Sequence, residues 1–211
     1  MSPEPSLVVA ELEALAAQRA APSSANLPLA EEASASAEVQ ELFQRYRERF
    51  GRNELPGILL CFATHPPLLR GMLEIAEGVL FVDGLLTRRQ KEMIATYLSL
   101  ENACPYCADS HGYFLCAQDG SRDVVSALRS GDLESRVLNN AERALLRFAG
   151  KVNAESQAIK RADIEDAIQA GWTEAQVAEA AHIAALFACF NRVANAFGMP
   201  SPYPGLWGNL P

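Results

Sequence analysis

Two capping boxes constrain the fold of this chain most strongly, because each one marks the residue at which a helix begins. In residues 87–90 (Thr-Arg-Arg-Gln) and again in residues 173–176 (Thr-Glu-Ala-Gln), a threonine precedes a glutamine by three positions, the spacing of a reciprocal helix cap. Apolar residues recur at helical spacing after Thr87 as far as Leu100, and the run after Thr173 is apolar nearly all round to about Phe197, as in a buried helix. The sequence has no alternating strand pattern of any length. The chain is therefore predicted to be all-α, a helical bundle.

Apolar spacing predicts further helices on both sides of these two runs. They cover residues 7–20, 36–50, 68 to about 80, 122–129, 141–152 and 159–170, with a short apolar segment at 58–63. We expect residues 1–35 to be an N-terminal extension with one short helix, residues 36–200 to be one helical domain, and residues 201–211 to be a Pro/Gly-rich tail.

The composition indicates a soluble globular protein. Of 211 residues, 49% are hydrophobic and 21% are charged, and the net charge of −8 argues against nucleic acid and anionic membrane as partners. The longest apolar stretch, residues 180–190, is interrupted by His182 and is too short to span a bilayer. The first residues carry Glu4, Glu11 and Glu13 and no basic segment ahead of an apolar one, unlike a secretory signal. A cytoplasmic location is expected.

The stretch from Glu101 to His111 holds two of the five cysteines and one of the three histidines. If a helix begins at Pro105, a residue suited to the first helical position, Cys107 and His111 lie one turn apart. Cys104 then lies at the mouth of that turn, where free N–H groups and the helix dipole favour a thiolate. Two thiols this close can form a disulfide, and His111 can hold a thiol proton. These residues predict a redox-active dithiol.

The pattern Glu92-x11-Cys104-x2-Cys107-x3-His111 resembles the signature of the alkyl hydroperoxidase D family, within the carboxymuconolactone decarboxylase-like superfamily. Residues 86–92 before the motif, and residues 171–176 and 191–195 near the end, agree with it. The resemblance covers roughly residues 40–200, and the length and ending resemble the peroxidase-related branch.

The resemblance implies a thiol-dependent peroxidase or disulfide reductase in antioxidant defence. Cys107 matches the cysteine that attacks peroxide and Cys104 the one that resolves the sulfenic acid to a disulfide, while His111 and Glu92 match a proton relay. The family further implies a homo-oligomer (dimer, trimer or hexamer), a thioredoxin- or lipoyl-type dithiol reductant, and no cofactor beyond the redox-active disulfide. One departure is Tyr106, which stands where the best-known members have a histidine, so the relay is expected to be shorter and turnover weaker.

Several alternatives remain open at this level. Cys104, Cys107, His111 and Cys116 could superficially supply four zinc ligands, although residues 112–115 read as continuing helix rather than a zinc-knuckle loop; no metal is expected. A carboxymuconolactone decarboxylase-type lyase is a second possibility, but such members generally lack the cysteine pair, and a non-catalytic thiol- or zinc-binding stress protein is a third. Tyr106 and, less strongly, His182 are candidates for binding substrate. The remaining thiols, Cys61, Cys116 and Cys189, are predicted to be buried in the core.

Overall fold

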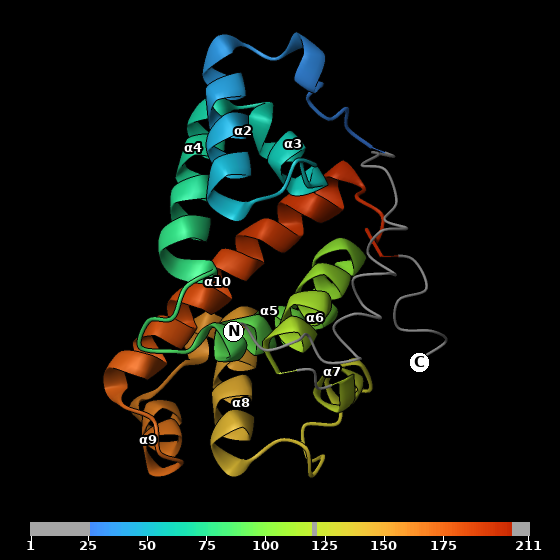
Figure 1. Ribbon diagram of the computed structural model, residues 1–211. Coiled ribbons are helices and arrows are strands. Elements are labelled where there is room, and N and C mark those ends of the chain that lie inside the picture. The colour runs from blue at the N-terminus through green and yellow to red at the C-terminus, as the bar shows by residue number, and fades with distance from the viewer. Residues whose placement is uncertain (1–25, 120–121, 204–211) are drawn as a thin grey trace, which may run out of the picture.

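The computed structural model describes residues 26–119 and 122–203, and within these ranges it contains helices and no strand (Figure 1). The all-α prediction is confirmed. The α-helices are α2 (Ala37–Phe50), α3 (Gly57–Ala63), α4 (Pro66–Ile75), α5 (Arg88–Glu101), α6 (Pro105–Asp119), α7 (Arg122–Arg129), α8 (Asn140–Glu155), α9 (Arg161–Gln169) and α10 (Glu174–Phe197). Short 3-10 helices lie at Glu32–Ser34 and Ser156–Ala158, and a π-helical turn follows α4 at Ala76–Leu80.

The helix starts lie where the capping residues predict them. Thr87 caps α5 and Thr173 caps α10, each with the reciprocal bond from the glutamine three residues later. Ser36 accepts a hydrogen bond from the backbone N–H of Val39 at the start of α2, and Gly51 ends that helix in the left-handed conformation at φ 63°. The predicted helix at residues 7–20 lies outside the described residues.

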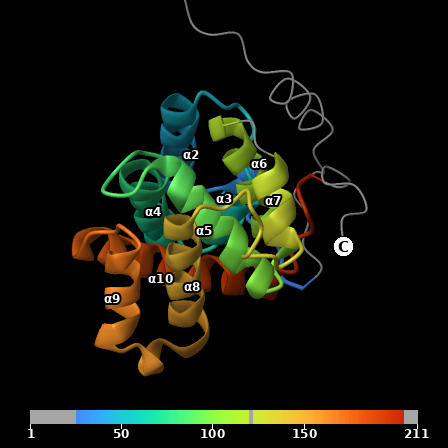
Figure 2. The same cartoon turned by 90° about the horizontal axis from the view of Figure 1, so that it is seen from below.

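The helix α10 runs diagonally through the molecule, and the other helices lie around it (Figure 1). It packs against α5 and α8 most extensively and also against α3, α6 and α9. The helices α5 and α6 form the closest pair, a helical hairpin with a turn of three residues, and Figure 2 shows α7 lying beside them. The hairpin carries the cysteine motif, so the central helix supports the candidate site from behind.

One prediction about the core was wrong. Cys61 and Cys116 are buried as predicted, but Cys189 is exposed. It shares an exposed face of α10 with His182 and Ala185, because neighbouring helices cover only part of this helix. Composition showed α10 as apolar all round, since alanines on its outer face look the same as alanines in a core.

Of the described helices, α10 is the one that is long and apolar enough to cross a membrane by length and composition, and 44% of its most apolar window is buried inside the protein. The core helix of a soluble protein has the same properties. One such helix is therefore weak evidence for a membrane span.

An ion pair of a buried lysine fixes the loop that leads into α5. Lys91 is 2% exposed, lies 2.8 Å from a carboxylate oxygen of Glu179 on α10, and donates to the carbonyl oxygens of Val79 and Val82. Gly84 lies so close to this pair that an added Cβ would meet the Glu179 carboxylate at 2.7 Å. The loop that carries Phe81 toward the candidate site is thus tied to both α5 and the central helix.

Candidate active site

The turn between α5 and α6 places Cys104 at the start of the motif helix. The N–H of Cys104 donates to the carbonyl of Ser99 at 2.8 Å and the N–H of Ala103 to the carbonyl of Leu100 at 3.0 Å, the paired bonds of a Schellman motif. Ala103 adopts the left-handed conformation that the motif requires, at φ 48°, where a residue with a Cβ costs about 1–2 kcal/mol. Packing of the hairpin therefore holds a strained turn directly before the first cysteine.

Cys104 caps the first turn of α6. Its carbonyl accepts the first helical hydrogen bond, from Ala108 at 2.9 Å. Its sulfur accepts a hydrogen bond from the Cys107 thiol, which is the largest cause of a lowered Cys104 pKa, and further bonds from the N–H groups of Cys107 and Tyr106 and from the side chain of Asn191. These donors favour the thiolate and outweigh the cost of burial.

Cys107 holds the proton of the pair. Its thiol donates to Cys104, and together with burial and the nearby Cys104 charge this raises its pKa well above the ordinary value. Cys61 lies in the same small buried cluster as the two motif cysteines, and burial raises its pKa to about 12. The first ionisation of the reduced site therefore leaves the charge on Cys104, while Cys107 keeps its proton.

Glu92 and His111 form the second half of the site. The Glu92 side chain is 3% exposed, and one of its oxygens lies 2.7 Å from Nδ1 of His111. The other oxygen lies 3.4 Å from Nε of Arg88. With Nδ1–H donating to the carboxylate, the neutral imidazole has Nε2 available as an acceptor. The ring is held edge-to-face against Phe187, with centroids 4.7 Å apart.

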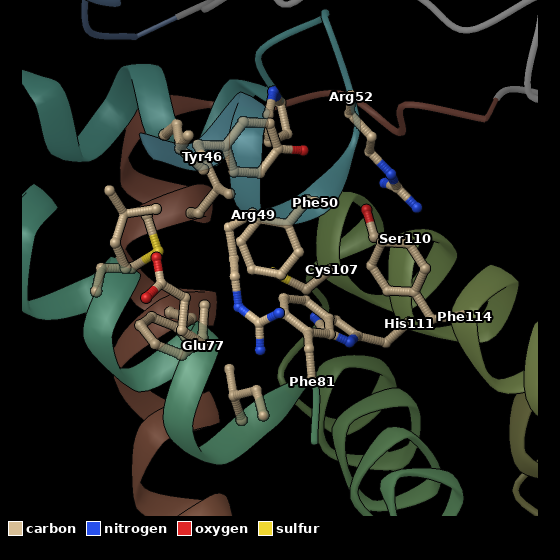
Figure 3. Close-up of a pocket in the computed structure, with 18 of the residues that line it drawn as sticks. Tyr46, Arg49, Phe50, Arg52, Glu77, Phe81, Cys107, Ser110, His111 and Phe114 are labelled. Atoms are coloured by element: carbon tan, nitrogen blue, oxygen red, sulfur yellow. The ribbon is translucent and has the colours of Figure 1, made fainter. Parts of the chain in front are cut away.

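A cavity of about 360 Å³ joins the dithiol to the histidine (Figure 3). Cys107, His111 and Tyr106 line it, whereas Cys104 is not among the described residues that do so. The Tyr106 hydroxyl accepts a hydrogen bond from the N–H of Ile58 at 3.1 Å, which fixes this side chain in the wall. His182 is exposed on α10 and lies apart from the cavity.

The cavity leaves room for a substrate between the thiols and the Glu92–His111 pair. Within residues 26–119 and 122–203, no hydrogen bond joins His111 to Cys104 or Cys107. Both His111 and Cys107 nonetheless line the same cavity from one face of α6. A small molecule bound there would lie between a sulfur and an imidazole.

The zinc alternative gains no support from the geometry. No three His, Cys, Asp or Glu side chains in the part of the chain that the structure describes are arranged to hold a metal ion.

Asn191 is the site residue that the sequence did not reveal. It is fully buried on α10, bonds to the sulfurs of both motif cysteines, donates to Ser99 Oγ at 3.0 Å and accepts from Asn102 at 2.9 Å. Asn102 in turn exchanges hydrogen bonds with Asn153. Sequence reasoning assigned Asn191 no contact with the motif, because its partners, from Ser99 to Cys107, lie 84 to 92 positions earlier in the chain.

Replacing Asn191 with alanine is expected to shift the thiolate titration of the reduced protein to higher pH. The amide favours the charged form of Cys104, so its loss raises the pKa of that thiol. The measurement is thiolate absorbance near 240 nm against pH, which needs no reagent to enter the site. Asn153→Ala is the matched control, because it breaks the same amide network without a bond to sulfur. A shift of equal size in both variants would show a general loosening rather than a direct effect.

Residues 66–149 match the model of the carboxymuconolactone decarboxylase family, a range that contains Glu92, both motif cysteines and His111. The matched segment, residues 66–149, is a domain of the carboxymuconolactone decarboxylase family. A sequence search of curated proteins gave no match.

Solved structures similar to this family domain extend the likeness to most of the chain. An alkylhydroperoxidase AhpD core from Ralstonia eutropha JMP134, described as a peroxidase-related protein, shares 28% identity at a TM-score of 0.77 and covers 89% of this chain and 96% of its own. A peroxidase-related protein from Silicibacter sp. TM1040 shares 25% identity at a TM-score of 0.75, with coverage of 92% and 98%. The predicted resemblance is confirmed at the level of the family.

The same fold also occurs in a protein with a different activity. The debrominase Bmp8, solved in complex with 2,3,4-tribromopyrrole, shares 18% identity at a TM-score of 0.64 and covers 88% of this chain and 96% of its own. At this identity the likeness shows the fold alone. The activity of this chain must therefore be argued from its own site.

Proposed function

We propose that this protein is a thiol-dependent reductase of organic hydroperoxides, with Cys107 as the attacking sulfur and Cys104 as the resolving one. The observation that carries the proposal is the placement of Cys107 and His111 on the wall of one cavity. Cys104 does not line the cavity and is hydrogen-bonded to Cys107. The peroxidase-related neighbours support the same class of activity.

The reaction begins with a proton transfer inside the dithiol. The proton on Cys107 moves to Cys104, along the hydrogen bond that joins the two sulfurs. The Cys107 thiolate then attacks the outer oxygen of the hydroperoxide and the O–O bond breaks, which gives a sulfenic acid and an alkoxide. His111, with Nδ1 held by Glu92, delivers one proton from solvent to the alkoxide and releases the alcohol.

The second half of the reaction closes the disulfide. The Cys104 sulfur attacks the sulfenic sulfur of Cys107, and the departing hydroxide takes the proton that the dithiol had kept and leaves as water. In total a hydroperoxide and two thiols give an alcohol, water and a disulfide. A thioredoxin- or lipoyl-type dithiol returns the site to its reduced state, and no further cofactor is required. The proposal includes a homo-oligomer and a role in antioxidant defence.

The test is a brief exposure of reduced protein to one equivalent of cumene hydroperoxide, followed by peptide mass spectrometry. A Cys104–Cys107 disulfide should form within seconds, with one equivalent of alcohol. Thiols that stay reduced would refute the proposal and leave the lyase or a non-peroxide disulfide substrate as candidates. Oxidation spread evenly over Cys107 and the exposed Cys189 would also count against it, since an unassisted thiol reacts without selectivity.

A further inference from the structure

The cavity beside Cys107 combines an aromatic body with a positively charged opening. Seven phenylalanine and tyrosine rings line it: Tyr46, Phe50, Phe81, Tyr106, Phe114, Phe190 and Tyr203. Its charged lining residues are Arg49, Arg52, Arg88 and Glu77. This balance is the reverse of the whole chain, whose net charge is −8.

The one carboxylate of the lining is already neutralised, whereas two of the arginines are available. Both oxygens of Glu77 accept hydrogen bonds from Arg45, at 2.6 and 2.9 Å. Arg49 and Arg52 are exposed, and no carboxylate among the described residues forms an ion pair with either of them. Figure 3 shows the Arg49 side chain directed into the cavity and the Arg52 side chain directed toward Phe114.

One aromatic ring, that of Phe114, lies between the Arg52 guanidinium at the opening and the His111 ring. The Arg52 guanidinium lies 5.3 Å from the Phe114 ring, and that ring lies 5.6 Å from the His111 ring, edge to face. If the reactive oxygen of a ligand lies between Cys107 and His111, a group at the opposite end of a ring-sized ligand would therefore lie at the arginines.

We infer that the natural substrate is an anionic organic hydroperoxide, with an apolar, ring-sized body against the phenylalanines and a carboxylate bound by Arg49 and Arg52. A guanidinium binds a carboxylate through two parallel hydrogen bonds, and a partly enclosed site strengthens such bonds. The paired Glu77 leaves the anion unopposed at this opening. The inference rests on the proposed function, because it names the class of hydroperoxide that the dithiol reduces.

The first arm of the test compares the rates at which two hydroperoxides oxidise the reduced full-length protein. The pair is cumene hydroperoxide and its para-carboxylate analogue, which differ only in the charged group. We expect the carboxylate to react about tenfold faster, as for one charge-assisted contact. In Arg49→Gln/Arg52→Gln the ratio of the two rates should fall at least about fivefold. Arg161→Gln, which removes an exposed charge on α9, should leave the ratio unchanged.

The second arm measures binding without chemistry, so that the two proposals can fail separately. By titration calorimetry, 4-isopropylbenzoate should bind about tenfold more tightly than neutral 4-isopropylbenzamide, and the double variant should lose that preference. If peroxides are reduced but neither arm shows a preference for the anion, the inference is overturned and the proposed function stands. If the benzoate binds through the two arginines but no hydroperoxide is reduced, the anion site stands and the proposed function fails. Absence of both signals overturns both.

Discussion

Replacing Cys107 with serine is expected to abolish hydroperoxide reduction, with the rate falling at least about a thousandfold, as when an enzyme loses its nucleophile. Cys107 supplies the sulfur of the dithiol that lines the cavity, so Cys104 cannot take over the attack from its position behind that wall. The measurement is consumption of cumene hydroperoxide with a dithiol reductant in excess. Cys189→Ser, which removes an exposed thiol that does not line the cavity, is the control and should keep the wild-type rate.

The companion variant separates attack from resolution. In Cys104→Ser the attacking sulfur remains but its partner is lost, so a sulfenic acid should accumulate on Cys107 and react with dimedone. Multiple turnovers should stop after the first. If Cys104 in the Cys107→Ser protein instead reacts with hydroperoxide at the wild-type rate and is labelled by dimedone, the two roles are reversed.

The more acidic cysteine, Cys104, is not the one that lines the cavity, Cys107, and the hydrogen bond between them reconciles the two observations. Cys104 loses its proton first, because the hydrogen bond from Cys107, backbone N–H groups and Asn191 stabilise its thiolate. Cys107 has the exposure to the cavity. Since the proton moves along one hydrogen bond, the first ionisation belongs to the pair. The sulfur that meets the peroxide then decides which cysteine is oxidised.

The helices could be predicted because their start signals are local. Thr87 with Gln90, and Thr173 with Gln176, cap helices through bonds that span three residues and need no tertiary partner. The helix predicted from residue 68 to about 80 also ends where expected, although its last turn, Ala76–Leu80, is π-helical.

The same distinction separates the predicted part of the site from the rest. Glu92, Cys104, Cys107 and His111 lie on one hairpin, so their spacing implies their proximity, and the structure confirms the contact of Glu92 with His111. Asn191 reaches the thiols from α10. The arginines at the opening come from the end of α2 and the loop that follows it. No spacing rule connects those segments to the motif.

Glu92→Gln is expected to lower the rate of hydroperoxide reduction about a hundredfold at pH 7, the lower end of what a positioned proton relay contributes. A neutral amide keeps the size of the side chain but removes the charge that orients Nδ1–H of His111. Glu92 is not among the groups that bond to either motif sulfur. The thiolate titration of Cys104 should therefore stay where it is while the rate falls.

The two readouts together distinguish a relay from a structural role. Rates are measured with cumene hydroperoxide under single-turnover conditions, and the titration is followed by thiolate absorbance in the same samples. Glu101→Gln is the matched control: it makes the same chemical change at the end of α5, on a side chain that is exposed, and should alter neither quantity. If the Glu92 variant showed both a lower rate and a shifted midpoint of the thiolate titration, the carboxylate would act by holding the hairpin together. An unchanged rate would remove the Glu92–His111 pair from the mechanism, and protonation of the leaving alkoxide would then fall to water in the cavity.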